Sequence, residues 1–210
     1  GVAYRRLDAP GADELAGAGV YYGAAATEAM AVMGRKVFVV GAGNSAGQAA
    51  MYLSRFASEV GLLVRGSGLA ATMSSYLIAQ LEANERGKVR CRTAVAQLHG
   101  EGRLERVTLR DLENERDYDE EAAAVFVFIG ANPHTDWLPP EVARDQQGFV
   151  LSGEDLPPVE GKRDRGWLET SVPGVFVAGD VRSRSVKRIA SAVGEGAMAV
   201  QAVHRYLAGA

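Results

Sequence analysis

A glycine-rich turn between an apolar run and a helical segment constrains the fold of this chain more than any other feature. Residues 37–40 form a short, unbroken apolar run that leads directly into Gly41-Ala42-Gly43-Asn44-Ser45-Ala46. Residues 44–56 then carry apolar side chains spaced for one buried helix face. A second apolar run at 60–64 completes a strand, turn, helix, strand unit. Such units close with right-handed crossovers, so the sequence predicts an α/β protein with a parallel, Rossmann-like sheet.

The turn itself predicts a nucleotide site. Gly41 permits a tight turn, Gly43 lets the backbone approach a pyrophosphate, and Ala46 allows close packing of helix on strand. The free N–H groups at the helix amino end, including those of Asn44 and Ser45, favour a negatively charged group. We therefore expect a dinucleotide here; the alternative is a glycine turn without a ligand.

The end of the second strand bears on cofactor choice. In NAD-binding folds an acidic residue at this place accepts hydrogen bonds from the ribose diol. Here the sequence reads Val64-Arg65-Gly66-Ser67. A guanidinium can pair with a 2′-phosphate, which favours NADP(H) over NAD(H). The alternative interpretation of Arg65 is a solvated surface arginine.

The remaining pattern gives a coarser outline. The opening residues, up to the first apolar run, read as loop because glycines interrupt them. Further expectations are a helix at 72–85 capped by Thr72 or Ser74, a hairpin turning at 99–102, a solvated connection at 110–121, strands at 125–129 and 175–178, and a surface loop at 136–165. The closing helix carries apolar residues at spacings of three and four, a stripe expected to pack on a sheet: Ile189, Val193, Ala197, Val200, Val203 and Leu207.

Composition excludes several classes of protein. The chain has 210 residues, and 47% of them are hydrophobic, which predicts a globular protein. The net charge of -3 predicts no general attraction to nucleic acid or to anionic membranes. No apolar run reaches bilayer length and no secretion signal is visible, which predicts a cytoplasmic location. The single cysteine, Cys91, cannot form an internal disulfide and is expected to fill a strand.

Four stretches carry a resemblance to a known family: GAGNSAGQAAMYLS, FVFIGANPHT, LETSVPGVFVAGDV and KRIASAVGEGAMAV. Over essentially its whole length the chain resembles the thioredoxin reductase family of two-domain flavoproteins. YYGAAATEAM, GLAATMSSYLI and GANPHTDWL further resemble a bacterial subgroup whose reductase module is often fused to a cyclic-nucleotide-binding or response-regulator domain.

The resemblance implies a domain plan. Residues 1–10 would be the crossover from a first FAD segment, 11–130 the NAD(P)H-binding domain, and 131–210 the C-terminal segment of the FAD-binding domain, with the N-terminal FAD segment absent from this chain. Asp180 would accept hydrogen bonds from flavin ribityl hydroxyls. The cofactor-binding residues that the resemblance adds are Ile129, Gly130, Gly179, Asp180, Lys187, Arg188, Ile189 and Ala190. We expect neither a metal site nor a side chain acting as acid or base.

The chain departs from this family at three places. The positions of the redox-active C-x-x-C pair hold Gly23 and Ala26, so thioredoxin reduction by a dithiol relay is not expected. The N-terminal pyrophosphate cradle for FAD is absent, so we expect weak or no FAD binding by this chain alone. A second arginine of the 2′-phosphate loop is replaced by Gly66 and a later basic residue by Ala70, which leaves Arg65.

The expected function is that of an NADPH-dependent flavoprotein oxidoreductase module, which passes hydride from NAD(P)H to FAD and on to an unidentified electron acceptor. The alternative is a non-catalytic dinucleotide-sensing module, or an incomplete fragment without flavin. A third interpretation is that a separate chain or domain supplies the first FAD segment. A homodimer is left open, and neither nucleic acid nor membrane is an expected partner.

Overall fold

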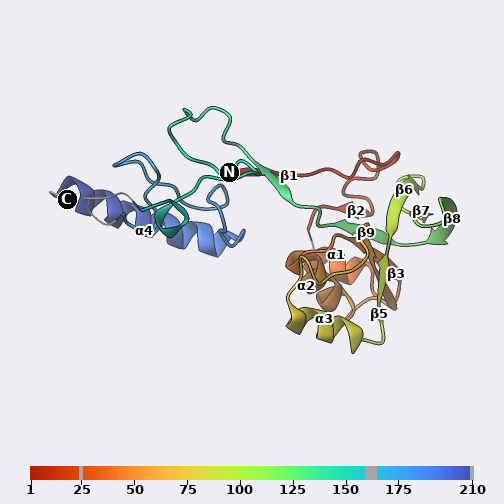
Figure 1. Cartoon of the computed structure of the whole chain (residues 1–210). Helices are drawn as coiled ribbons and strands as arrows, with labels where there is room; N and C mark the ends of the chain where they lie inside the picture. Colours follow the sequence, from red (N-terminus) through yellow and green to blue (C-terminus); the bar gives the residue numbers. More distant parts are fainter. Residues whose placement is uncertain (24–25, 159–164, 209–210) are drawn as a thin grey trace. The chain divides into compact units, whose positions relative to one another are not determined.

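A computed structural model describes residues 1–23, 26–158 and 165–208. The chain divides into two compact units (Figure 1), and each is described by itself. We call residues 5–130 the sheet unit, and residues 1–4 together with 131–210 the tail unit.

A five-stranded parallel sheet forms the centre of the sheet unit. Its strand order is β2-β9-β3-β4-β5. The strands are β2 (Val20–Tyr21), β3 (Lys36–Val40), β4 (Glu59–Val64), β5 (Gly87–Cys91) and β9 (Ala124–Val127). The helices are α1 (Ala26–Ala31), α2 (Asn44–Leu53) and α3 (Ser75–Glu82). A separate antiparallel sheet contains β6 (Thr93–His99), β7 (Arg106–Asp111) and β8 (Arg116–Glu121).

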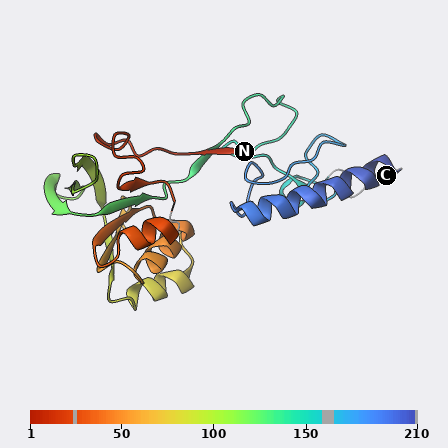
Figure 2. The same cartoon turned by 180° about the vertical axis from the view of Figure 1, so that it is seen from behind.

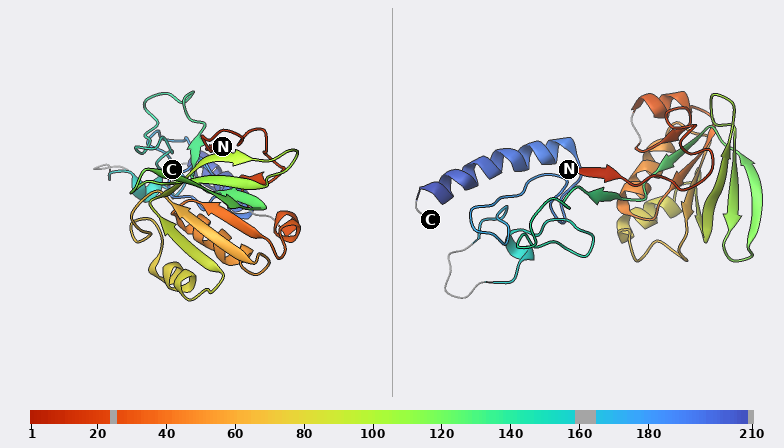
Figure 3. Two further views of the ribbon diagram at one scale, coloured as in Figure 1. Left: turned by 90° about the vertical axis from the view of Figure 1, so that its right-hand side faces the viewer. Right: turned by 90° about the horizontal axis from the view of Figure 1, so that it is seen from above.

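Both faces of the parallel sheet are buried, and the residue alternation within each strand shows how. In β3, Val37 and Val39 belong to the core beneath the helices, whereas Phe38 and Val40 belong to the core beneath the antiparallel sheet. Figure 3 shows the antiparallel strands stacked on one side of the parallel sheet and the helices on the other. This double covering explains why the strands read as unbroken apolar runs.

The tail unit contains much less regular structure. β1 (Val2–Tyr4) pairs antiparallel with β10 (Ala131–Pro133), and Gly153–Asp155 forms a short 3-10 helix. Figure 2 shows the long helix α4 (Ile189–Leu207) ending near the C-terminus. The apolar cluster of this unit is small and is built around Val142, Val150 and Val177.

The fold class is confirmed: the chain is α/β, with a Rossmann-like parallel sheet and a small antiparallel element. Two local expectations are wrong. The opening residues are not all loop, because they include β1, β2 and α1, three elements too short to show a periodicity. The segment 110–121 is largely solvated, as expected, but it is not a mere connection, because β8 lies within it. β8 is an edge strand with mostly exposed charged side chains, which pair across to β7, as Asp117 does with Arg110 at 2.7 Å.

Two expectations for the tail unit are also wrong. Residues 175–178 form no strand; Phe176 makes only an isolated bridge to Glu169. A strand needs a continuous hydrogen-bonded neighbour. This segment makes only two such bonds to the described residues before it, from Thr170 N–H to the Val175 carbonyl and from Val177 N–H to the Leu168 carbonyl, besides a local turn bond from Val175 N–H to Val172. The apolar stripe of α4 does not pack on a sheet, because Ile189 is 86% exposed and Leu207 is 74% exposed. None of the helices in the described ranges has the length and hydropathy of a bilayer-spanning helix.

Candidate functional site

The glycine turn follows β3 directly, and its first residue has to be glycine. Gly41 has φ +147°, and a Cβ added there would lie 2.5 Å from the carbonyl oxygen of Phe128. Its N–H donates to the carbonyl of Leu63 at 3.1 Å. The turn is therefore wedged between the carboxyl ends of β4 and β9, where open α/β sheets bind ligands.

Gly43 lies at the amino end of helix α2 and faces open space. It is the N-cap residue, no side chain caps the helix, and the nearest atom to an added Cβ is the Thr72 carbonyl oxygen at 3.9 Å. The first intrahelical bond runs from Gly47 N–H to Gly43 carbonyl at 3.1 Å. The N–H groups of the preceding helical residues therefore have no intrahelical acceptor. Together with the positive end of the helix dipole, they form an anion-binding corner.

The three helical residues of the motif have different surroundings. Ala46 is fully buried, and it is 3.0 Å from a Cβ built on Gly41, so a larger side chain would displace the turn. Asn44 and Ser45 are exposed. The Asn44 Oδ1 atom accepts a hydrogen bond from the Ser74 N–H at 2.8 Å, so the side chain braces the corner and its backbone N–H is the group available to a ligand.

Residues that the sequence analysis did not assign to the site complete this corner. The Thr72 hydroxyl donates to the carbonyl of Ala42 at 2.7 Å. Of the two candidate caps for α3, Ser74 is the N-cap residue, but its side chain makes no capping hydrogen bond. Thr72 and Ser74 both tie the loop before α3 to the glycine turn. Gly47 lets α3 approach, because a Cβ there would lie 2.6 Å from Leu77 Cδ2.

The other expected residues of the sheet unit lie at the same edge of the parallel sheet. Arg65 is exposed one residue beyond β4 and forms no hydrogen bond or ion pair with the described part of the chain. Ile129 and Gly130 follow β9; Ile129 is half-buried, and Gly130 is exposed with φ +95°. Gly41–Ala46, Arg65, Ile129 and Gly130 thus share one edge of one sheet.

The expected flavin-binding residues form a separate cluster in the tail unit. Gly179 has φ +81° and donates its N–H to Glu195 Oε2 at 2.7 Å. The Oδ1 atom of Asp180 is buried and has no hydrogen-bond partner among the described residues. A buried oxygen without a hydrogen-bond partner can accept a hydrogen bond from a hydroxyl group of a ligand.

A buried ion pair holds this cluster, and the sequence analysis did not assign it a role. Arg182 and Glu195 are each 6% exposed, and their side chains form two hydrogen bonds, of 2.5 and 3.1 Å. The indole of Trp167 covers the guanidinium at 4.7 Å. Hydrogen bonding from Arg182, against the opposing effect of burial, holds the pKa of Glu195 below its ordinary value, and the Gly179 N–H adds to this. Glu195 therefore links α4 to the turn that carries Asp180.

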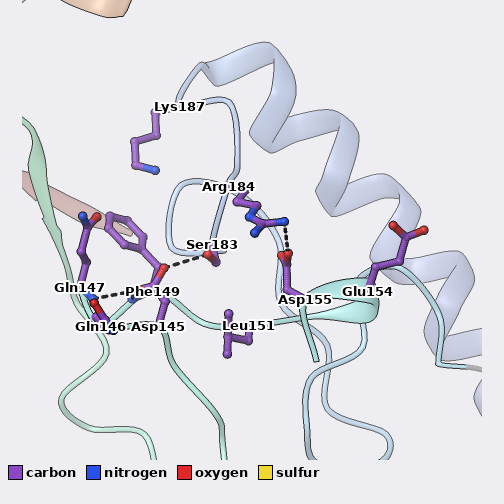
Figure 4. Close-up of a pocket in the computed structure, with 10 residues that line it drawn as sticks. All are labelled: Asp145, Gln146, Gln147, Phe149, Leu151, Glu154, Asp155, Ser183, Arg184 and Lys187. Atoms are coloured by element: carbon purple, nitrogen blue, oxygen red, sulfur yellow. Dashed lines mark hydrogen bonds and ion pairs between the residues drawn. The ribbon is translucent and has the colours of Figure 1, made fainter. Parts of the chain in front are cut away.

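Lys187 lies at the rim of a pocket of about 660 Å³ in the tail unit (Figure 4). Its ammonium group lies 4.2 Å from the centre of the Phe149 ring. Burial lowers the pKa of Lys187, while Asp180 and Asp145 oppose that shift. The pocket is lined by Asp145, Gln146, Gln147, Phe149, Leu151, Glu154, Asp155, Ser183, Arg184 and Lys187. Arg188, Ile189 and Ala190 are exposed at the start of α4.

The two positions that correspond to the C-x-x-C pair of the family described under Sequence analysis lie in the sheet unit. Gly23 lies in a bend and Ala26 begins α1, with residues 24 and 25 outside the described ranges. Cys91, the single cysteine of the sequence, is the last residue of β5, in a strand as expected, and its side chain is exposed. No dithiol can form within this sequence.

The fold and its sheet-edge glycine turn define an α/β protein of the Rossmann-like class. Comparison with known proteins narrows this class: the Pyridine nucleotide-disulphide oxidoreductase family matches residues 1–196, and the chain belongs to that family. It is 32% identical over 208 residues to thioredoxin reductase of Bacillus subtilis, covering 99% of this chain and 61% of the relative. It is 30% identical over 210 residues to thioredoxin reductase of Chlamydia pneumoniae, covering 99% and 63%.

Solved structures agree with the fold. Thioredoxin reductase from Giardia duodenalis aligns with a TM-score of 0.77 at 27% identity, over 99% of this chain and 64% of that one. Thioredoxin reductase from Streptococcus pyogenes aligns with a TM-score of 0.72 at 28% identity, over 100% and 64%. The chain thus spans slightly less than two thirds of the length of these relatives.

Proposed function

We propose that this chain is the NAD(P)H-binding module of a thioredoxin-reductase-like flavoprotein oxidoreductase, together with a C-terminal segment that contributes to flavin binding. The observation that carries the proposal is the corner at Gly41–Ala46: a left-handed glycine, an uncapped helix amino end and open space in front of it. This arrangement suits the diphosphate of a dinucleotide. Membership of a family named for pyridine nucleotides supports the same assignment.

The residues of the sheet unit would bind and orient the nucleotide. The backbone N–H groups of Asn44, Ser45 and Ala46 would hold the diphosphate, and Arg65 would hold a 2′-phosphate, which favours NADPH over NADH. Ile129 and Gly130 lie at the carboxyl end of β9 beside the turn, where they would line the nicotinamide half of the site. We assign residues 11–130 to this nucleotide-binding domain.

The residues of the tail unit fit a flavin at one position. Asp180 presents a buried carboxylate oxygen without a partner among the described residues, which matches the ribityl hydroxyls of FAD. Gly179 keeps the backbone close to α4, and Lys187, Arg188, Ile189 and Ala190 stand at the amino end of that helix. When bound, FAD would accept a hydride from the nicotinamide and deliver electrons to an acceptor.

The chain would act without a dithiol relay, because Gly23 and Ala26 stand at the cysteine positions. We propose that the acceptor therefore takes electrons directly from the flavin. We also propose that a further segment, carried by the same or another polypeptide, supplies the rest of the flavin site, since this chain spans 61% of the Bacillus subtilis reductase and 63% of the Chlamydia pneumoniae reductase.

Calorimetric titration with NADPH and NADH tests the nucleotide assignment. We expect NADPH to bind more tightly than NADH, and Gly43→Asp to abolish binding of both by placing a carboxylate against the diphosphate. Gly166→Asp is a matched control, because Gly166 also faces open space, is not among the glycines with positive φ, and lies far along the chain from the turn. Arg65→Ala should weaken NADPH more than NADH. Equal affinity of the parent protein for both nucleotides would defeat the 2′-phosphate assignment.

A flavin experiment tests the oxidoreductase half of the proposal. The protein is mixed with FAD and, in a second sample, also with a segment corresponding to the first part of its reductase relatives. We expect flavin uptake in the second sample, bleaching of its absorbance by NADPH, and loss of both with Asp180→Asn. A colourless sample that still binds NADPH would favour a nucleotide-sensing module instead.

A further inference from the structure

A second arginine stands beside Arg65 at the edge of the parallel sheet. Strands β4 and β5 are paired in register, with Val64 opposite Cys91. Arg65 and Arg92 are the next residue of each strand, and neighbouring parallel strands lie about 4.8 Å apart. The N–H of Arg92 donates to the carbonyl of Gly66 at 2.9 Å, which confirms that the two strand ends stay together.

The backbone of Arg92 is fixed in an unusual conformation. Its φ is +50°, a left-handed value that a non-glycine residue rarely adopts. Bonds on both sides hold it: its N–H donates to Gly66, and its carbonyl accepts from the Leu112 N–H at 2.8 Å. Strained backbone held in this way is often found at ligand sites. Here it anchors an arginine next to the loop at which the ribose 2′ position is expected.

The Arg92 guanidinium already holds an anion in the protein alone. It forms an ion pair with the carboxylate of Glu113, and the two side chains are 48% and 60% exposed. Glu113 lies on the turn between β7 and β8, where the Asp111 carboxylate accepts the Glu113 N–H at 2.8 Å. An exposed pair of this kind is weak, about 0 to 1 kcal/mol. A phosphate dianion offers more charge and more acceptor oxygens to the same guanidinium.

We propose that Arg92 is a second specificity-determining residue for a nucleotide 2′-phosphate, and that Glu113 competes with that phosphate for its guanidinium. The inference rests on the proposed nucleotide site and extends it. Arg65 and Arg92 flank the phosphate from adjacent strand ends. Glu113 pairs with Arg92 whenever no 2′-phosphate is present, so it weakens binding of the phosphorylated nucleotide and leaves the affinity for NADH unchanged.

Calorimetric titration with 2′-phospho-ADP-ribose and with ADP-ribose tests the pair, because these probes share the adenosine diphosphate and differ only in the 2′-phosphate. Arg92→Gln should weaken binding of 2′-phospho-ADP-ribose about tenfold and change that of ADP-ribose less than about twofold. Glu113→Gln should tighten binding of 2′-phospho-ADP-ribose about twofold to threefold, by removing the competing charge. Opposite responses of the two variants cannot come from a common folding defect.

Arg106→Gln provides the control. Arg106 pairs with Asp119 at 3.3 Å at the other end of the same antiparallel sheet, and both side chains are 49% exposed. This variant should leave both affinities unchanged. If the parent binds ADP-ribose but Arg92→Gln weakens both probes equally, or neither, the role of Arg92 is overturned while the nucleotide site stands. If the parent binds neither probe, the proposed function fails, and this inference fails with it.

Discussion

Helices α2 and α4 have similar amphipathic sequences, but they have opposite surroundings. α2 buries its small and apolar side chains, including Ala46, Ala49 and Leu53, in the helix-covered core of the sheet unit. The buried residue of α4 is Glu195, and its apolar stripe is exposed. Periodicity therefore predicts that a helix is amphipathic, whereas the surface that covers its apolar face depends on what else packs against it.

The two units are consequently stabilised by different interactions. The sheet unit has large apolar side chains buried on both faces of its sheet, among them Phe38 and Phe126. The tail unit has a small apolar cluster, and its best-buried polar contact is the pair between Arg182 and Glu195.

Breaking the buried ion pair should have the largest effect. Arg182→Gln leaves the Glu195 carboxylate buried without a compensating charge, which costs about 3 to 5 kcal/mol. Tryptophan fluorescence during denaturation measures this, because both tryptophans, Trp137 and Trp167, lie in the tail unit. Arg184→Gln is the control: its ion pair with Asp155 involves an arginine side chain that is 82% exposed, so the change should be within about 1 kcal/mol. Equal effects of the two variants would contradict this account.

Truncating one apolar side chain on each helix should give the next largest difference between the two units. Leu53→Ala in α2 removes a fully buried side chain, and it should lower the free energy of unfolding by about 2 to 5 kcal/mol. Val200→Ala in α4 removes a side chain that is 57% exposed, and it should change stability by less than about 0.5 kcal/mol. Denaturation followed by circular dichroism compares them. A cost above about 2 kcal/mol for Val200→Ala would mean that the stripe is covered in solution.

A smaller effect should come from the ion network at the margin of the sheet unit. Lys36 contacts both Glu59 and Glu120, and Arg90 contacts the same two carboxylates. Hydrogen bonding from Lys88 and Lys36 lowers the pKa of Glu59 despite burial. For Glu120, burial raises the pKa, but hydrogen bonds from Arg90 and Lys36 outweigh it and leave the pKa lowered.

The sign of the resulting pH dependence follows from these lowered values. In the unfolded chain both glutamates bind protons more readily, so their stabilisation is complete above the unfolded pKa of about 4.3 and is lost as the pH falls through the folded values. Lys36→Met should lower the free energy of unfolding by about 1 kcal/mol at neutral pH. It should also make the fall in stability towards acidic pH less steep. Urea titrations between neutral and acidic pH measure both. If stability falls towards acidic pH as steeply as in the parent protein, Lys36 does not contribute to the lowered pKa values of the two glutamates.

The features that can be predicted from the sequence are those set by residues close together in the chain. The runs that became β3 and β4, the glycine turn and α2 are each visible because burial or a tight turn imposes one residue type at a fixed spacing. The left-handed conformation of Gly41 and the burial of Ala46 lie within that local pattern.

The sequence does not predict the contacts between distant segments. Thr72 and Ser74 brace the glycine turn across about thirty residues, and no periodicity encodes such a bond. The charged edge strand β8 looks like a solvated connection, because its mostly exposed residues carry no apolar alternation. Arg90 and Arg92 are only two residues apart in the sequence. Arg90 nevertheless belongs to the ion network, whereas Arg92 lies at the edge of the sheet and pairs with Glu113. Only the pairing of the strands shows this difference.

The central claim is that the amino end of α2 binds the diphosphate of a nicotinamide dinucleotide. Amide chemical shifts of isotope-labelled protein during titration with NADPH test it most directly. The account predicts that the largest shifts fall on Gly41, Gly43, Asn44, Ser45 and Ala46, and that Gly43→Asp removes them. Saturating NADPH that leaves these five amides unmoved, while shifting others or none, would contradict it.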